Sequence, residues 1–181
     1  LYGVELDNIT GRIAKKLYPD VNIQIKGFED TTFPNNHFDL VVGNVPFCGY
    51  SVYDKDYNKY NLLIHDYFIA KSVDKVRPGG IVAVITSKGT MDKQSQNARK
   101  YIADRAELIG AIRLPNTAFK KLAGTEAVAD ILFLKKRDTP INATLENTEW
   151  LGVSKNEFGY ELNNYFINHK EMILGTLKED F

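Results

Sequence analysis

The chain has 181 residues, of which 44% are hydrophobic and 25% are charged, with 23 basic residues balanced by 23 acidic ones. This composition is that of an ordinary globular domain, and it excludes a disordered chain or a polycation that holds nucleic acid by charge alone. The single cysteine, Cys48, excludes an internal disulfide framework and a zinc site built from several thiolates. No apolar run reaches the roughly 18 residues of a membrane span and no signal peptide is visible, so we expect a soluble, cytoplasmic protein.

Hydrophobic periodicity predicts an alternation of strands and helices. Strand-type runs lie at 1–5, 21–25, 37–42, 81–85, 108–114 and 127–134. Helical spacing occurs at 9–17, 62–76 and 93–105. The central strands are almost entirely apolar, which is typical of strands covered on both faces. The order predicts an α/β fold with a doubly wound, mostly parallel sheet. The last two strands lack an intervening helical pattern and predict an antiparallel edge strand, paired with its neighbour at the edge of the sheet.

The character of the chain changes after Arg137. Residues 138–181 are polar and contain no long apolar run between Ile141 and Tyr160. We therefore expect a core domain at 1–137 and a C-terminal extension at 138–181 that leads to a further domain. The chain also opens on Leu1 inside an apolar stretch, so we expect it to have been cut from a longer protein.

Ligands of open α/β sheets bind at the carboxyl ends of the strands, and two early strand ends carry suitable side chains. At the first, Glu5 can accept both hydroxyls of a ribose, while Asp7 is placed to cap the following helix. At the second, Phe28 stands beside Glu29 and Asp30, and an aromatic ring next to an acid suits a nucleobase. A helix cap and a plain surface turn would explain the same residues.

The third strand end carries Asn44, Val45, Pro46 and Phe47 directly after an apolar strand. Asn44 offers an acceptor oxygen, and Pro46 biases Val45 toward extended geometry, which fixes the direction of the Val45 carbonyl. Phe47 provides a flat face for stacking. Two acceptors and a stacking face suit a planar amine, although Asn and Pro are also common in an ordinary strand-to-loop turn.

The segment 44–47 resembles the (Asp/Asn/Ser)-Pro-Pro-(Tyr/Phe) motif of amino methyltransferases that use S-adenosylmethionine. The segments 77–86, 114–119 and 125–134 also resemble downstream parts of N6-adenine-specific DNA methyltransferases. This resemblance spans about 1–137. The segment 165–175 is similar to stretches of large methylase–helicase fusion proteins of mobile elements.

The resemblance implies a Rossmann-like fold that binds S-adenosylmethionine, with Glu5 at the ribose and Phe28 and Glu29 at the adenine of the cofactor. It further implies that residues 44–47 hold the exocyclic N6 amine of an adenine flipped out of DNA and that Phe119 packs against the other side of this base. The implied reaction is methyl transfer to that amine, in a restriction-modification or mobile-element setting. The implied partners are DNA and the target-recognition and helicase domains of a parent chain, without a membrane.

Two features depart from the family pattern. Val45 stands where the motif has proline, and the family's first strand and Gly-rich loop, which wraps the methionine end of the cofactor, have no counterpart. We therefore expect the chain by itself to be inactive. Two alternatives stay open: an amino methyltransferase that acts on RNA or on a protein glutamine, and a non-catalytic methylase-like module that binds DNA. His37, His65 and His169 are scattered without metal-ligand spacing, so we expect no metal site.

Overall fold

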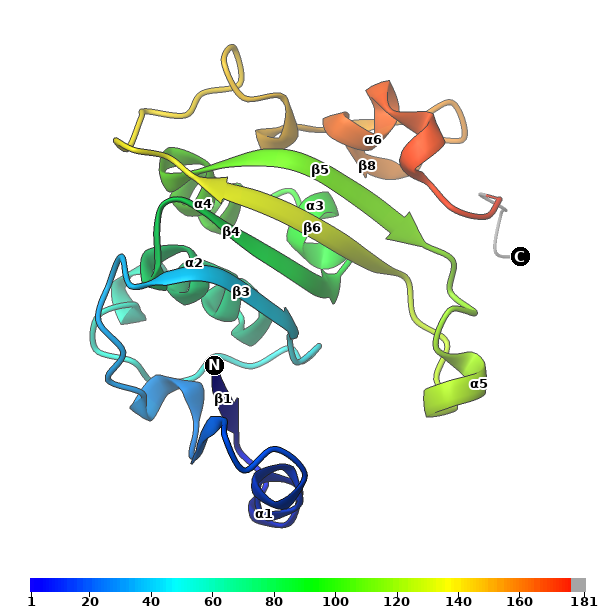
Figure 1. Cartoon of the computed structure of the whole chain (residues 1–181). Coiled ribbons are helices and arrows are strands. Elements are labelled where there is room, and N and C mark those ends of the chain that lie inside the picture. The colour runs from blue at the N-terminus through cyan, green and yellow to red at the C-terminus, as the bar shows by residue number, and fades with distance from the viewer. Residues whose placement is uncertain (177–181) are drawn as a thin grey trace.

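A computed structural model describes residues 1–176, with the backbone only for Leu122 and Ala123 (Figure 1). The strands are β1 (Tyr2–Glu5), β2 (Asn22–Ile25), β3 (Phe38–Asn44), β4 (Val76–Ser87), β5 (Ala106–Leu114), β6 (Ala129–Lys136), β7 (Val153–Lys155) and β8 (Glu161–Asn163). The α-helices are α1 (Asn8–Leu17), α2 (Ile64–Lys75), α3 (Gly89–Asp92), α4 (Asn97–Arg105), α5 (Lys120–Ala123) and α6 (Asn164–Asn168). Short 3-10 turns are η1 (Phe28–Asp30), η2 (Asn58–Tyr60), η3 (Glu149–Leu151) and η4 (Lys170–Met172).

The main sheet has the strand order β3-β4-β6-β5 and confirms the α/β class. β3 runs parallel to β4, whereas β6 is antiparallel to both β4 and β5. The antiparallel pair at the edge of the sheet is therefore confirmed as β6 and β5, in which β5 is the outermost strand and β6 lies one strand inside it. The physical reason is the connection through α4, which leads from β4 to β5 and leaves a gap of one strand between them. The chain then turns back after β5, and β6 fills this gap.

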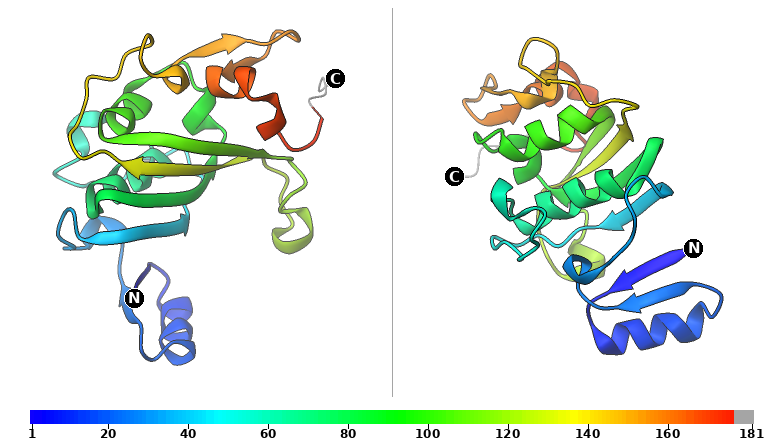
Figure 2. Two further views of the ribbon diagram at one scale, coloured as in Figure 1. Left: turned by 45° about the horizontal axis from the view of Figure 1, so that its top comes forward. Right: turned by 90° about the vertical axis from the view of Figure 1, so that its left-hand side faces the viewer.

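A separate two-stranded sheet pairs β1 with β2 in parallel, and α1 packs against it. The Asp7 side chain accepts a hydrogen bond of 2.7 Å from the amide of Thr10, which confirms Asp7 as the N-cap of α1. Within residues 1–176, no hydrogen-bonded strand joins β1 to β3. In the right-hand view of Figure 2, β1, β2 and β3 point in the same direction.

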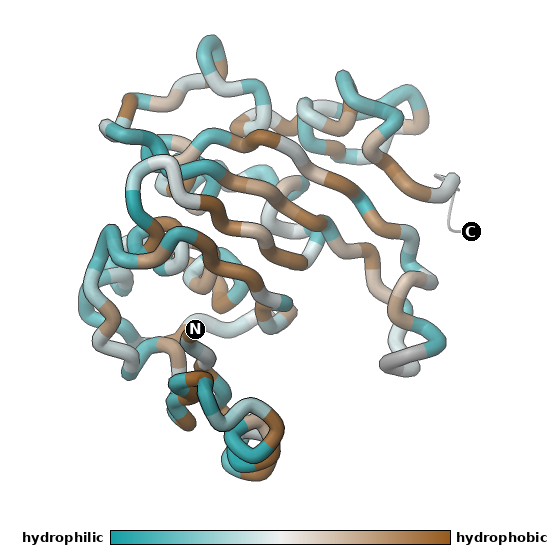
Figure 3. Tube along the Cα trace, in the orientation of Figure 1, coloured by the Kyte–Doolittle hydropathy of each residue, from teal (hydrophilic) through white to brown (hydrophobic). Residues whose placement is uncertain are grey.

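Helices α2 and α4 cover one face of the main sheet, as Figures 1 and 2 show. Val82 and Val84 of β4 are buried toward these helices. On the other face, Leu40 and Val42 of β3 are 55% and 70% exposed, and Figure 3 shows the apolar strands of the sheet from this side. The apolar character of the strands predicted that both faces of the sheet would be covered. Within the described residues, however, helices cover only one face of this sheet.

The segment after β6 packs against α3, α4 and β5 rather than extending from them. Trp150, Leu151, Leu162 and Phe166 belong to the same hydrophobic core as α2 and α4. Arg99 of α4 donates two hydrogen bonds, of 3.0 and 3.1 Å, to the Leu151 carbonyl. The sequence showed little sign of this packing, because the apolar residues of this segment occur in short groups separated by polar residues. The division at residue 137 stays a prediction.

Among the described helices, none has the length and apolar character needed to cross a membrane.

Candidate functional site

The segment 44–47 continues β3 at the carboxyl edge of the main sheet. Asn44 is the last residue of β3, lies opposite Ile85 of β4 and has an exposed side chain. The Val45 amide donates a hydrogen bond of 3.0 Å to the Ile85 carbonyl, and the Val45 side chain is buried in the core. Phe47 is partly exposed. This arrangement restrains the Val45 backbone through its amide and leaves the side chains of Asn44 and Phe47 exposed.

Glu5 is the last residue of β1, and Glu29 lies in η1, the turn that follows β2. Glu5 is half-buried, and its Oε1 accepts a hydrogen bond of 2.8 Å from the Asp7 amide. The Glu29 carboxylate folds back over Gly27, so closely that a Cβ built on Gly27 would overlap it. Glu29 thus presents its acid from the space in which a side chain at position 27 would stand.

Phe28 lies in η1 and packs against α2. Its ring centroid is 5.0 Å from that of Phe68 and 6.2 Å from that of Tyr67. Phe68 is half-buried and belongs to this cluster of three aromatic rings, Phe28, Tyr67 and Phe68. Sequence reasoning missed Phe68, since an aromatic residue in an amphipathic helix is normally a core residue. The only available signal was its place in the helix that follows residues 44–47.

Phe119 caps α5 in the connection between β5 and β6, where Figure 1 shows α5 beyond the carboxyl end of β5. It is half-buried. Among the described residues, no aromatic contact joins it to Phe47. Its role against the target base therefore stays a prediction.

A buried polar cluster lies at the carboxyl end of β4, next to the strand that ends at Asn44. Thr86 hydrogen-bonds Thr90 at 2.9 Å, and Thr90 donates to Asp66 of α2 at 3.1 Å. Asp66 also forms an ion pair with Lys93. Beside it, His65 is buried, and burial lowers the pKa of its ring although the Asp66 carboxylate opposes this shift. His65 is therefore neutral near pH 7.

Within the described part of the chain, no group of three or more histidine, cysteine or acidic side chains is placed to hold a metal ion.

The fold matches that of a known methyltransferase class. A solved structure of a candidate class I S-adenosylmethionine-dependent methyltransferase from Listeria monocytogenes has a TM-score of 0.60 to this chain at 20% identity. The match covers 81% of this chain and 47% of that one. The chain thus has the Rossmann-like fold of class I methyltransferases.

The sequence then identifies the family. Residues 3–119 match the model of the Eco57I restriction-modification methylases, and the chain belongs to this family. The "Defense against restriction protein B" of Escherichia phage P1 is 35% identical over 138 residues, which are 73% of this chain and 6% of the phage protein. A candidate protein N5-glutamine methyltransferase of Methanocaldococcus jannaschii is 25% identical over 126 residues, 64% of either chain. The chain therefore spans a small part of the first relative and about two thirds of the second.

Proposed function

We propose that this chain contributes the catalytic core of a DNA methylase that methylates the N6 amine of adenine with S-adenosylmethionine as the methyl donor. The observation that carries the proposal is the arrangement of residues 44–47 at the end of β3, where the exposed side chains of Asn44 and Phe47 flank a Val45 backbone held by its amide hydrogen bond to Ile85. Membership of a restriction-modification methylase family supports DNA as the substrate.

The ends of β1 and β2 carry side chains that fit the cofactor. Glu5 would accept the ribose hydroxyls, and Glu29 would accept from the exocyclic amine of the cofactor adenine. Phe28 would supply a stacking face. The fit rests on the donor set and on Gly27, whose missing side chain leaves room for the Glu29 carboxylate. When bound, S-adenosylmethionine supplies an electrophilic methyl group, which leaves the protein chiefly the tasks of binding and orientation.

The target amine needs activation because its lone pair is delocalised into the adenine ring. Acceptance of its two N–H bonds by Asn44 Oδ1 and the Val45 carbonyl would favour a pyramidal nitrogen with a free lone pair. Phe47 would stack on the base, which must leave the DNA duplex to reach this site. The proton is released only as the nitrogen becomes cationic, so no strong base is required before attack.

Valine at position 45 is compatible with this chemistry. Proline in the motif would restrict φ and fix the carbonyl direction. Here the hydrogen bond from the Val45 amide to the Ile85 carbonyl and the buried Val45 side chain supply that restraint. This argues for a working site over the non-catalytic DNA-binding module.

The remaining parts of the proposal concern the whole protein. DNA recognition would come from target-recognition and helicase domains of a parent chain. The proposal also keeps the cytoplasmic location that the sequence predicted. Methylation of a protein glutamine is the second candidate function, and the M. jannaschii relative favours it. RNA stays a third substrate class, because the motif at 44–47 does not distinguish these amines.

Single-turnover methyl transfer tests the proposal. The parent protein, rather than this chain by itself, is given labelled S-adenosylmethionine with an adenine-containing duplex, the same duplex without adenine, an RNA and a glutamine peptide. We expect label only in the first. Asn44→Ala should lower the rate about a hundredfold, the usual effect of removing a hydrogen bond that strengthens in the transition state, without changing cofactor affinity. Asn97→Ala, an exposed asparagine on α4, serves as the control. Label in the peptide, or an unchanged rate for Asn44→Ala, would refute the assignment.

A further inference from the structure

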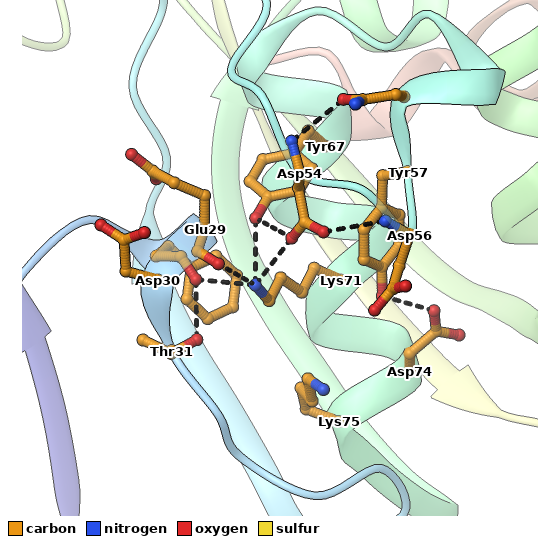
Figure 4. A network of polar contacts seen from close by, with 12 residues as sticks. Glu29, Asp30, Thr31, Asp54, Asp56, Tyr57, Tyr67, Lys71, Asp74 and Lys75 are labelled. Atoms are coloured by element: carbon orange, nitrogen blue, oxygen red, sulfur yellow. Dashed lines mark hydrogen bonds and ion pairs between the residues drawn. The ribbon is translucent and has the colours of Figure 1, made fainter.

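A buried lysine of α2 lies between the turn that carries Phe28 and Glu29 and the loop that follows Phe47 (Figure 4). Lys71 is 3% exposed. Its ammonium donates hydrogen bonds to the carbonyls of Phe28 and Glu29, at 2.8 and 3.2 Å. It also forms an ion pair of 2.9 Å with Asp54. One side chain thus contacts both the turn that the proposed function assigns to the cofactor and the loop that follows the proposed target-base segment 44–47.

Asp54 also forms hydrogen bonds within its own loop, the one that follows Phe47. Its carbonyl accepts from the amides of Tyr57 and Asn58, both at 2.9 Å. Its Oδ2 accepts from the Tyr67 hydroxyl at 2.8 Å as well as from Lys71. Burial by itself would raise the pKa of Asp54, but the hydrogen bonds from Lys71 and Tyr67 lower it below its ordinary value. Asp54 is therefore the charged partner of Lys71 near pH 7.

The turn η1 depends on the same lysine. The Phe28 carbonyl accepts from Lys71 and from the hydroxyl of Thr31, the latter at 2.7 Å. The Lys71 ammonium also lies 5.1 Å from the centre of the Phe28 ring. A buried ammonium is costly unless it is fully paired, so loss of the carbonyls or of Asp54 would leave an uncompensated charge in the core.

We propose that Lys71 is a positioning residue that couples the cofactor-adenine turn to the loop beside the target-base site. Because the buried charge needs both sets of acceptors, ordering of one segment favours ordering of the other. The roles of the two segments rest on the proposed function, whereas the coupling itself rests on the contacts of Lys71. Cofactor binding at Phe28 and Glu29 would then help to order the loop at 50–58 before a base enters.

Amide hydrogen exchange measured by NMR on the free protein tests the coupling. The reporters are hydrogen-bonded amides of both segments, Asp30 and Thr31 in the turn and Tyr57 and Asn58 in the loop. Lys71→Met should speed exchange about tenfold or more at all four. The control is Lys136→Met, which removes a lysine that donates to two carbonyls, of Asp74 and Val76, at the far end of α2. It should leave the four rates within about twofold of the wild type.

Acceleration at only one segment by Lys71→Met, or the same acceleration by Lys136→Met, would overturn the proposal. If Lys71→Met does not fold, Asp54→Asn removes the charge at nearly constant size, and unchanged rates in the turn would refute the coupling. In the parent protein, S-adenosylhomocysteine should slow exchange in both segments of the wild type, but only in the turn of Lys71→Met. Failure of the parent protein to bind it would refute the proposed function, while the exchange rates of the free protein would still decide the coupling.

Discussion

At the scale of single residues, Gly27 decides where the acid of the cofactor site stands. The Glu29 carboxylate lies over Gly27, in space that any larger side chain would take. The sequence placed an acid at this strand end but did not indicate that its position depends on a glycine two residues earlier. The dependence arises because η1 turns the chain back on itself at Phe28.

In the parent protein, Gly27→Ala should therefore weaken binding of S-adenosylmethionine about tenfold, the equivalent of one displaced hydrogen bond to a charged group. Isothermal titration calorimetry measures the effect. Gly110→Ala adds the same methyl group to β5, where the nearest atom outside its chain neighbours is 3.9 Å away, and should leave the affinity unchanged. Equal affinities for wild type and Gly27→Ala would remove Glu29 from the site.

His65 gives a second prediction at this scale, in stability against pH. Its folded-state pKa is lowered by burial, whereas the unfolded chain takes up the proton near pH 6.5. The free energy of unfolding should therefore fall as the pH drops through about 6.5, because the unfolded state binds more protons. His65→Leu should flatten this decline in urea titrations between about pH 7 and pH 5.5. An equally steep decline in the variant would contradict a buried neutral His65.

At the scale of elements, the segment after β6 behaves as part of the core. Phe166 of α6 is fully buried, and the Arg113 guanidinium of β5 lies 4.4 Å from the centre of its ring. Arg113 in turn pairs with Asp130 of β6 and Asp92 of α3. These contacts join α6, β5, β6 and α3, so the chain beyond residue 137 contributes to the stability of the sheet.

Phe166→Ala should destabilise the protein by about 3–5 kcal/mol, the usual cost of removing a buried phenylalanine. Urea unfolding should remain a single transition, because the segment and the sheet share one core. Phe158, on the exposed turn between β7 and β8, offers the control, and Phe158→Ala should cost less than about 0.5 kcal/mol. A separate early transition in Phe166→Ala would show that residues 138–176 unfold independently.

At the scale of the whole molecule, the two faces of the main sheet differ. Val84 is buried against the helices, while Val42 of the neighbouring strand is exposed on the opposite face. Both valines are in regular strand, so strand propensity affects them alike and only their surroundings differ.

Replacement of each valine by threonine tests this asymmetry. Val84→Thr should cost about 1–3 kcal/mol, because it places a hydroxyl in an apolar core. Val42→Thr should stay within about 0.5 kcal/mol of the wild type, since its hydroxyl would face solvent. Urea midpoints of the two variants give the comparison. Equal losses would mean that the face carrying Val42 is covered in solution.

The sequence by itself determined the local features of this protein. Hydrophobic periodicity depends on neighbouring residues, so it located most strands and helices, including the sheet strands on either side of α4. It also identified Glu5, Phe28, Glu29 and Asn44 as residues that follow strands, because a polar residue, or an aromatic residue next to an acid, after an apolar run is visible without any tertiary contact. The segment 44–47 carried the family resemblance that the family match then confirmed.

Only the tertiary structure decided which elements meet. The position of β6 inside β5 depends on hydrogen bonds between strands far apart in the chain. Phe68 and Lys71 look like ordinary residues of an amphipathic helix, and their relation to Phe28 arises from contacts about forty residues apart. Burial of Phe166 likewise requires the folded sheet. Local pattern records the surroundings that a residue prefers, whereas long-range packing determines which partner supplies them.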